Sequence, residues 1–323
     1  MLELKKRKTI FLTRKIPEIA FRLLREEGHI IELWDGTSPP TPGELIQKCQ
    51  EADALLSMLS DRLDENFFKK CSHLKVIANY AVGVNNIDLK AAARYNIPVG
   101  NTPDVLTEAT SDLALGLILT LARNIFPAIQ NAKQGEWKKW EPLGFLGMEL
   151  KGKTLGIIGL GRIGQSLAKK AQNGFGMNII YTSRTKTKTI NPSYKRHTLQ
   201  ELLKSSDIVS IHTDLNPSTE NLIGHKEFEI MKSHAYIINT ARGEIINQKA
   251  LVGALKMGLI GGAGLDVTTP EPLSPNDPLF QTPNTIITPH IGSATVEARD
   301  LMATLATKNI IAGLKGEPLP NRL

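Results

Sequence analysis

The fold is decided by the stretch Gly156-Ile-Ile-Gly159-Leu-Gly161-Arg-Ile-Gly164, a G-x-G-x-x-G pattern that follows an apolar run and opens a helical one. Gly159 permits a tight turn, Gly161 lets the backbone approach a pyrophosphate, and Gly164 allows a helix to pack closely on a strand. The free N–H groups and positive dipole of that helix N-terminus attract an anion. The pattern alone is weak, but strand, turn and helix together favour dinucleotide binding over a chance glycine turn.

On both sides of this turn, short apolar runs alternate with helical segments, which predicts parallel sheets covered by helices. A long helix, Val105–Arg123, separates the two alternations, and a last helix is expected from Ser293 to about Gly313. The sequence therefore predicts an α/β protein with two doubly wound parallel-sheet domains. The expected strands are Thr9–Thr13, His29–Leu33, Ala54–Met58, Lys75–Asn79, Ile97–Val99, Leu155–Ile158, Ile179–Thr182, Ile208–Ile211, Tyr236–Asn239, Gly262–Leu265 and Thr285–Thr288.

Length and composition are those of an ordinary globular protein. At 323 residues the chain is longer than one hydrophobic core usually serves. The net charge of +7 comes without a zinc-finger, RNP or basic-aromatic pattern, so we expect a surface suited to anionic small molecules and no nucleic-acid partner. Cys49 and Cys71 form no metal-binding pattern, so no metal is expected. The longest apolar stretch, Leu113–Ala122, is about half of a membrane span, which predicts a cytoplasmic protein without a membrane partner.

The end of the second strand of the later alternation bears on which dinucleotide binds. Ser183 lies 19 residues after Gly164, where NAD enzymes commonly carry the acid that holds the ribose 2′-hydroxyl. Here the acid is missing, and Arg184 and Thr185 follow instead. A hydroxyl beside an arginine would accept the 2′-phosphate through charge-assisted hydrogen bonds, so NADPH is favoured. A solvated basic loop in an enzyme that also uses NADH is the alternative.

Three side chains at strand ends supply what hydride transfer to a ketone requires. Arg242 leaves a buried strand and can grip a 2-keto acid with its planar fork, although a structural ion pair is the competing interpretation. His290, which follows a proline at the end of another strand, can exchange a proton near neutrality. Glu271, hydrogen-bonded to one ring nitrogen, would fix the tautomer and favour the imidazolium. We therefore predict Arg242, Glu271 and His290 as the catalytic residues.

These motifs carry a resemblance that covers nearly the whole chain. The sequence resembles the D-isomer-specific 2-hydroxyacid dehydrogenases and, within them, the glyoxylate/hydroxypyruvate reductases. Besides the glycine turn, the matching segments are Ala81-Val-Gly-Val-Asn-Asn-Ile-Asp88, Leu106-Thr-Glu-Ala-Thr-Ser-Asp112, Asn239-Thr-Ala-Arg-Gly243, Asp266–Pro272 and Thr288-Pro-His-Ile-Gly292.

The resemblance implies a Rossmann cofactor domain inserted into a flavodoxin-like substrate domain. The substrate domain would comprise residues 1–103 and 291–323, and the cofactor domain residues 104–290. Apart from the resemblance, residues 124–150 hold Trp137 and Trp140 in a segment of weak periodicity, which suggests an irregular excursion: a dimerisation arm, taken as residues 123–150, or a surface loop with buried anchors. The resemblance also implies that Arg242, Glu271 and His290 are the family's catalytic residues. The expected cofactor-binding residues are Gly159, Leu160, Gly161, Arg162, Ile163, Gly164, Ser183, Arg184, Thr185, Thr110, Thr240 and Asp266.

The resemblance further predicts a pocket for a small 2-keto or 2-hydroxy acid. Backbone N–H groups around Val82 and Gly83 would receive the substrate carboxylate, and Arg242 and His290 would also contact the substrate. Leu59 would flank a short substrate side chain. Trp140 matches a tryptophan that closes the pocket from a neighbouring subunit, which implies a homodimer.

Other functions of this fold remain open at the level of sequence. A broader-specificity D-2-hydroxyacid dehydrogenase or a phosphoglycerate dehydrogenase is the nearest enzymatic alternative; the second would require more cationic groups in the substrate loop. A corepressor-like binding protein that senses NAD(H) is the non-enzymatic alternative. The small-acid pocket pattern favours NAD(P)H-dependent reduction of glyoxylate, hydroxypyruvate or both.

Overall fold

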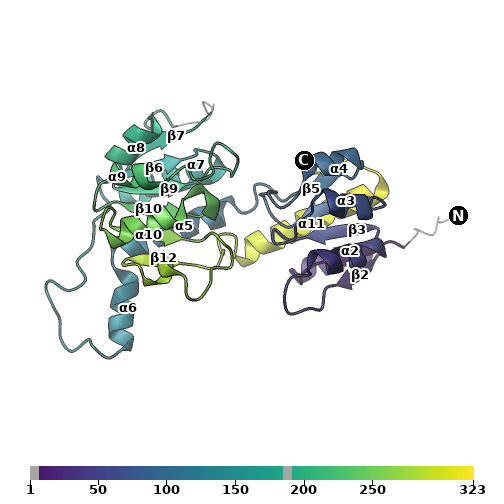
Figure 1. Cartoon of the computed structure of the whole chain (residues 1–323), viewed down its shortest axis with the longest axis horizontal. Coiled ribbons are helices and arrows are strands. Elements are labelled where there is room, and N and C mark those ends of the chain that lie inside the picture. The colour runs from purple at the N-terminus through teal and green to yellow at the C-terminus, as the bar shows by residue number, and fades with distance from the viewer. Residues whose placement is uncertain (1–6, 185–190) are drawn as a thin grey trace. The chain divides into compact units, whose positions relative to one another are not determined.

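The structure is a computed structural model that describes residues 7–184 and 191–323. The chain divides into two compact units (Figure 1). Unit 1 comprises residues Met1–Leu106 and Ala294–Leu323, and unit 2 comprises Thr107–Ser293. Each unit is built around one parallel sheet, and each is described separately below.

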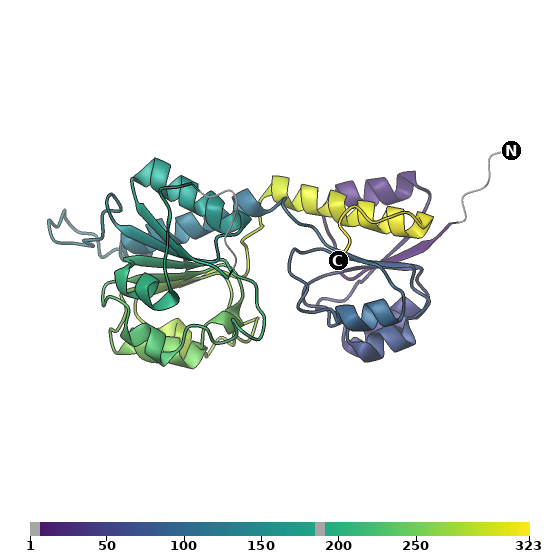
Figure 2. The ribbon, with the colours of Figure 1, turned by 90° about the horizontal axis from the view of Figure 1, so that it is seen from above.

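Unit 1 holds a five-stranded sheet in the order β2-β1-β3-β4-β5, in which every neighbouring pair is parallel. Helices cover both faces of this sheet (Figure 2). One face packs against α1 and α11, and the other against α2, α3 and α4. Its elements are β1 (Thr9–Leu12), α1 (Glu18–Glu26), β2 (Ile30–Leu33), α2 (Pro42–Gln50), β3 (Ala54–Ser57), α3 (Glu65–Lys70), β4 (Val76–Asn79), α4 (Leu89–Arg94), β5 (Val99–Gly100) and α11 (Val296–Lys315).

Unit 2 holds a seven-stranded sheet in the order β12-β11-β10-β9-β6-β7-β8, again parallel throughout. Its elements are α5 (Thr107–Ala122), α6 (Ile125–Lys133), β6 (Thr154–Ile158), α7 (Arg162–Phe175), β7 (Asn178–Thr182), β8 (Lys195–Arg196), α8 (Leu199–Ser205), β9 (Ile208–Ile211), α9 (His225–Glu229), β10 (Tyr236–Asn239), η1 (Gly243–Ile245), α10 (Gln248–Lys256), β11 (Gly262–Leu265), η2 (Pro278–Gln281) and β12 (Thr285–Ile287).

The direction of winding in unit 2 reverses between β6 and β9, which are neighbours in the sheet although β7 and β8 separate them in sequence. Helices α5 and α7 pack on one face, and α8, α9 and α10 on the other (Figure 2). Such a reversal opens a crevice at the carboxyl ends of the strands, where ligands of open α/β sheets bind. The predicted class of fold, two doubly wound parallel sheets, is confirmed.

Local sequence explains where these elements begin. The strands read as near-continuous apolar runs because both faces of a parallel sheet are covered by helices. Thr41 caps α2, and its hydroxyl and Glu44 form a capping box. Every predicted strand is present, and its ends differ from the prediction by at most two residues.

Two elements had not been predicted. The edge strand β8 has only two residues, both basic and exposed, so it carries no apolar pattern. Helix α6 lies in the segment that the sequence suggested was an irregular excursion. None of its residues is buried. Its apolar residues Ile125, Phe126, Ile129 and Ala132 nevertheless recur at helical spacing, a signal that sequence reasoning missed.

Within residues 7–184 and 191–323, no single helix is long and apolar enough to cross a membrane. Helices α5 and α6 pass that test only when they are taken together, and they are bent by 65° relative to each other.

Candidate active site

The glycine-rich turn joins β6 to α7 at the point where the winding reverses. Gly159 has a φ of +93°, and a Cβ there would lie 2.5 Å from the carbonyl oxygen of His212, so only glycine fits. A Cβ on Gly164 would lie 2.4 Å from the carbonyl oxygen of Gly159. Gly161 has no neighbouring atom within 4 Å of the corresponding position. The turn is thus tight on its inner side and open at Gly161, as a pyrophosphate requires.

Helix α7 presents its N-terminus to this open side. Gly161 precedes the first residue of this 14-residue helix, and no side chain caps its leading N–H groups. Those groups and the helix dipole are available to an anion. Leu160 is buried and can offer only its backbone, whereas Arg162 is exposed and Ile163 is half-buried.

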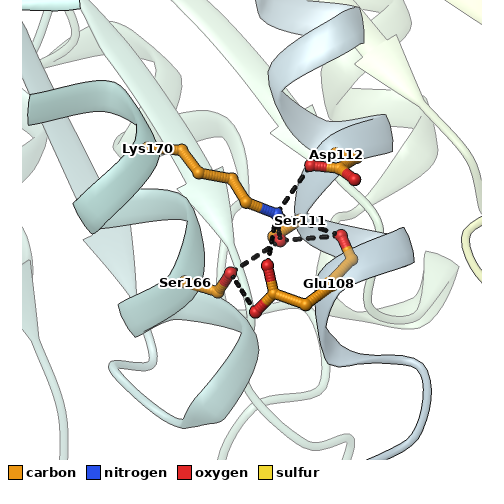
Figure 3. Close-up of polar contacts among 5 residues, drawn as sticks. All are labelled: Glu108, Ser111, Asp112, Ser166 and Lys170. Atoms are coloured by element: carbon orange, nitrogen blue, oxygen red, sulfur yellow. Dashed lines mark hydrogen bonds and ion pairs between the residues drawn. The ribbon is translucent and has the colours of Figure 1, made fainter. Parts of the chain in front are cut away.

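Helix α7 is held against α5 by a polar cluster around Lys170 (Figure 3). The ammonium donates hydrogen bonds to Ser111 at 2.7 Å and Asp112 at 2.6 Å, and it lies 2.8 Å from a carboxylate oxygen of Glu108. Ser166 also donates to Glu108, at 2.9 Å. Burial alone would lower the pKa of Lys170, but its hydrogen bonds and the nearby acids outweigh burial and raise it. The cluster fixes the position of α7 relative to α5.

The end of β7 carries the residues expected to bind the adenosine ribose. Ser183 and Arg184 follow this strand directly, while Thr185 lies outside the described residues. Arg196, in β8, donates a hydrogen bond to the carbonyl oxygen of Ser183 at 2.7 Å and lies 3.5 Å from that of Arg184. Sequence reasoning had not singled out Arg196, because its strand was not recognised.

Two threonines complete the region that would receive a cofactor. Thr110, on α5, is buried and lies next to Gly292. Thr240 follows β10, and in the described part of the chain its buried hydroxyl has no hydrogen-bond partner. A buried hydroxyl without a partner is uncommon and favours a ligand that supplies one. Together with the open glycine turn, it fits a nicotinamide dinucleotide.

Arg242 lies in a turn that follows β10. The amide of Asn239 donates to the carbonyl oxygen of Arg242 at 2.8 Å and accepts from the N–H of Ala241 at 3.0 Å, so this buried asparagine shapes the turn. A Cβ on Gly243 would lie 2.1 Å from the carbonyl oxygen of Thr268, so the turn presses directly on the loop after β11. Sequence reasoning had not assigned a role to Asn239.

Glu271 and His290 follow the two neighbouring strands β11 and β12, and the structure brings them together. The Oε1 atom of Glu271 accepts a short hydrogen bond from Nδ1 of His290. This contact leaves Nε2 of the ring for a reacting group. The hydrogen bond predicted between Glu271 and His290 is therefore observed in unit 2.

Asp266 anchors the loop that carries His290. Its carboxylate accepts hydrogen bonds from the hydroxyl of Thr288 at 2.6 Å and from the N–H groups of Ile291 at 2.8 Å and Gly292 at 2.7 Å. Its carbonyl oxygen accepts from the N–H of His290 at 2.9 Å. Burial raises the pKa of Asp266, although these hydrogen bonds oppose the shift. The residue predicted to bind the cofactor thus also holds the loop that carries His290.

The expected substrate residues of unit 1 lie in two loops at the carboxyl ends of β3 and β4. The buried amide of Asn79 donates to the carbonyl oxygen of Gly83 at 3.0 Å. Asn86 donates to the carbonyl oxygens of Met58 at 3.1 Å and Asp61 at 2.9 Å, on either side of Leu59. These two asparagines, which sequence reasoning had not assigned, tie the loops to each other.

The side chains expected to contact substrate are available for such contact. Leu59 is an exposed large hydrophobic residue in unit 1, and Val82, expected to act through its backbone N–H group, is also exposed. Trp140, in the arm of unit 2, is 82% exposed.

A dinucleotide turn, an arginine and a carboxylate-paired histidine at the carboxyl ends of adjacent strands define a class, the nicotinamide-dependent oxidoreductases. The family model of the D-isomer specific 2-hydroxyacid dehydrogenase NAD binding domain matches residues 115–292. The chain belongs to the D-isomer-specific 2-hydroxyacid dehydrogenase family. The resemblance inferred from the motifs is confirmed.

Individual relatives match over nearly their full length. A glyoxylate reductase from Thermococcus litoralis is 48% identical over 97% of this chain and 95% of its own. The solved structure of the TT0316 protein from Thermus thermophilus is 44% identical, with a TM-score of 0.93 over 98% of this chain and 99% of its own. An NADPH-dependent glyoxylate/hydroxypyruvate reductase from Sinorhizobium meliloti, solved with NADP and malonate, is 29% identical, with a TM-score of 0.87 over 98% and 97% of the two chains.

Proposed function

We propose that this chain is a glyoxylate reductase that also accepts hydroxypyruvate, yielding glycolate and D-glycerate. The observation that carries the proposal is the hydrogen-bonded pair of Glu271 and His290, which follows strands of the same sheet that carries the dinucleotide turn. The curated relatives named glyoxylate reductase, at up to 48% identity, support the choice of substrate. The activity is that of an NAD(P)H-dependent oxidoreductase acting on a small 2-keto acid.

The roles of the residues follow from what the reaction needs. The reduced nicotinamide, when bound, supplies the hydride that the carbonyl carbon accepts. His290 gives the proton from Nε2 to the carbonyl oxygen as negative charge develops there, and Glu271 at Nδ1 stabilises the charged ring. Arg242 orients the substrate through its planar guanidinium. Backbone N–H groups around Val82 and Gly83 receive the substrate carboxylate.

The cofactor would be held by the glycine turn, the N-terminus of α7, Thr110, Thr240, Asp266 and the residues after β7. We propose that NADPH is preferred, because Ser183 and Arg184 occupy the place of the usual ribose-binding acid. A reductase of similar fold whose structure contains NADP supports this preference.

We further propose that two copies of the chain form a homodimer through the arm, residues 123–150. The arm exposes a concentration of large apolar side chains, and none of the residues of α6 is buried. A concentration of exposed large apolar residues in one segment favours a protein interface there. These side chains are Ile125, Phe126, Ile129, Trp137, Trp140, Leu143, Phe145 and Leu146.

One steady-state panel tests the proposed activity. It pairs NADPH and NADH with glyoxylate, hydroxypyruvate, pyruvate and a bulkier 2-keto acid. We expect the highest kcat/KM with glyoxylate or hydroxypyruvate and NADPH. Turnover that is fastest with the bulky acid would replace the proposed substrate class, and faster turnover with NADH would replace the proposed cofactor.

A further inference from the structure

The edge strand β8 places a basic side chain beside the end of β7. The two strands are parallel, with Ile180 paired with Lys195 and Tyr181 paired with Arg196. Because successive side chains of a strand point to opposite faces, Lys195 and Arg196 project in opposite directions. Only Arg196 reaches the residues that follow β7, where its Nη2 atom lies 2.7 Å from the carbonyl oxygen of Ser183.

This position coincides with the part of a dinucleotide fold that meets the ribose 2′ position. That position is the end of the second strand, here β7, where Ser183 and Arg184 follow. The bond to Ser183 uses one donor of Arg196, and a guanidinium has several more in a fixed plane. Both arginine side chains are exposed. Across residues 7–184 and 191–323, neither arginine has a carboxylate partner within salt-bridge distance.

Arg184 and Arg196 bring two positive charges to the end of β7, and a dianion bound there would offset their mutual repulsion. We infer that Arg196 is a ligand of the 2′-phosphate of NADPH, which it binds together with Arg184. The inference rests on the proposed preference for NADPH and extends it to a residue on a neighbouring strand. The bond to Ser183 holds the guanidinium in place, so little freedom is lost when the phosphate binds.

The alternative is that Arg196 only supports the backbone after β7. Arg196→Gln removes the charge that a phosphate would need and leaves a shorter side chain with an amide donor. A loss of backbone support alone would weaken binding with and without a 2′-phosphate equally, whereas loss of a phosphate ligand would not. Lys195→Gln is the matched control, since it removes the same charge from the adjacent residue on the opposite face of the strand.

The experiment measures binding by calorimetry on the full chain, with adenosine 2′,5′-bisphosphate and with AMP as probes. We expect Arg196→Gln to weaken binding of the bisphosphate by about tenfold, the usual size of one charge-assisted hydrogen bond, and to change AMP binding less than about twofold. Lys195→Gln should change neither by more than about twofold. An Arg196→Gln chain that binds the bisphosphate as the unmodified chain does, or that loses AMP affinity equally, overturns the inference.

Thermal unfolding establishes that each variant is folded. If Arg196→Gln fails to fold, Arg196→Lys keeps the charge and loses the planar fork, and it should weaken bisphosphate binding by about threefold with AMP unaffected. Unchanged bisphosphate binding in that variant counts against the inference. None of these measurements requires turnover, so a chain that fails to reduce glyoxylate would refute the proposed function and leave this inference standing.

Discussion

His290 adopts a φ of +54°, in the left-handed region that residues other than glycine seldom occupy. The surroundings stabilise this conformation: the N–H of His290 is bonded to the carbonyl oxygen of Asp266, and the Asp266 carboxylate holds Ile291 and Gly292 just beyond it. Backbone strain held by such a network is typical of functional sites, where it aims a side chain. The conformation and the bond to Glu271 together set the direction of the ring.

Replacing His290 by alanine tests its role as proton donor. We expect kcat to fall by a factor of about 10² to 10⁴, the usual contribution of a general acid, while the Kd for NADPH changes little. Glu271→Gln keeps a hydrogen-bond acceptor but removes the charge, so its loss of kcat should be smaller. Steady-state kinetics with glyoxylate measures both. His225→Ala, at the start of α9, is the control, and a His290→Ala enzyme that keeps the unmodified kcat contradicts the assignment.

Among single residues, those that the reaction requires could be predicted from the sequence, whereas those that hold the backbone could not. Arg242, Glu271 and His290 stood out because the reaction needs a cation, a carboxylate and a proton donor at strand ends. Asn239 and Arg196 act through contacts with backbone carbonyl oxygens. Such contacts depend on how two loops meet, which residue type and spacing do not reveal.

At the scale of elements, strand β6, the glycine turn and helix α7 allow an effect on cofactor binding to be distinguished from an effect on stability. Gly161 has an ordinary negative φ and open space where a Cβ would stand, so Gly161→Ala should fold with a free energy of unfolding within about 1 kcal/mol of the original. The added methyl group would occupy the space proposed for the pyrophosphate, and NADPH binding should weaken by at least about tenfold. Calorimetric titration with NADPH measures the affinity.

Gly159→Ala is the contrasting variant for that prediction. Its φ of +93° and the carbonyl oxygen of His212 at 2.5 Å leave no room for a methyl group, so it should lose stability as well as affinity. A Gly161→Ala chain with unchanged NADPH affinity would show that the dinucleotide does not approach this turn.

Asp207 precedes β9 in unit 2, at the amino end of the sheet, opposite the end that carries the glycine turn. It joins three segments of the chain there. Its carboxylate accepts hydrogen bonds from Lys232 at 2.8 Å and from the N–H of Thr154 at 2.8 Å, and His234 lies 3.0 Å away. Burial by itself would raise the pKa of Asp207, but these bonds and the Lys232 charge lower it to about 2. A pKa below the unfolded value of about 3.9 means that the ionised carboxylate stabilises the fold above that pH.

Asp207→Asn should therefore lower the free energy of unfolding by about 2 kcal/mol near neutral pH. The difference from the unmodified chain should persist down to a pH of about 4 and shrink as the pH falls further, because the unfolded carboxylate then takes up a proton while the native one stays ionised until the pH nears 2. Urea unfolding across this range measures it. Asp214→Asn, at an exposed acid, is the control, and an effect of Asp207→Asn that grows on acidification would contradict this account.

The strands were predictable because a parallel sheet covered on both faces leaves a near-continuous apolar run in the sequence. β8 could not be found in this way, since Lys195 and Arg196 pair only through their backbone at the sheet edge. Helix α6 was missed for a different reason: its apolar residues recur at helical spacing, but none of them belongs to the apolar clusters of its unit.

For the whole molecule, two parallel sheets give four apolar clusters, one on each face of each sheet. The number of sheets and their class could be predicted, because length sets how many cores a chain can build and the alternation of elements sets their type. The assembly of chains could not be derived in the same way. Only the structure shows that the apolar side chains of the arm are exposed and lie outside the cores of the fold, which is the observation that points to an interface.

The exposed apolar side chains of the arm therefore predict where two copies of the chain contact each other. Phe126 and Ile129 are exposed on α6, one turn apart, and replacing both by glutamate would place two charges inside the proposed interface. We expect the unmodified chain to sediment at twice the monomer mass and the double variant at the monomer mass. In the presence of NADPH, the melting temperature of the double variant should equal that of the unmodified chain.

Met257→Glu, at an exposed apolar residue of unit 2 outside the arm, is the matched control and should remain dimeric. If Trp140 reaches the substrate of the partner copy, the monomeric variant should also lose its discrimination between glyoxylate and bulkier 2-keto acids, as Trp140→Ala should within an intact dimer. A double variant that stays dimeric places the interface elsewhere. A monomer that keeps its selectivity assigns the closure of the pocket to residues of its own chain, because no second copy is then present to provide it.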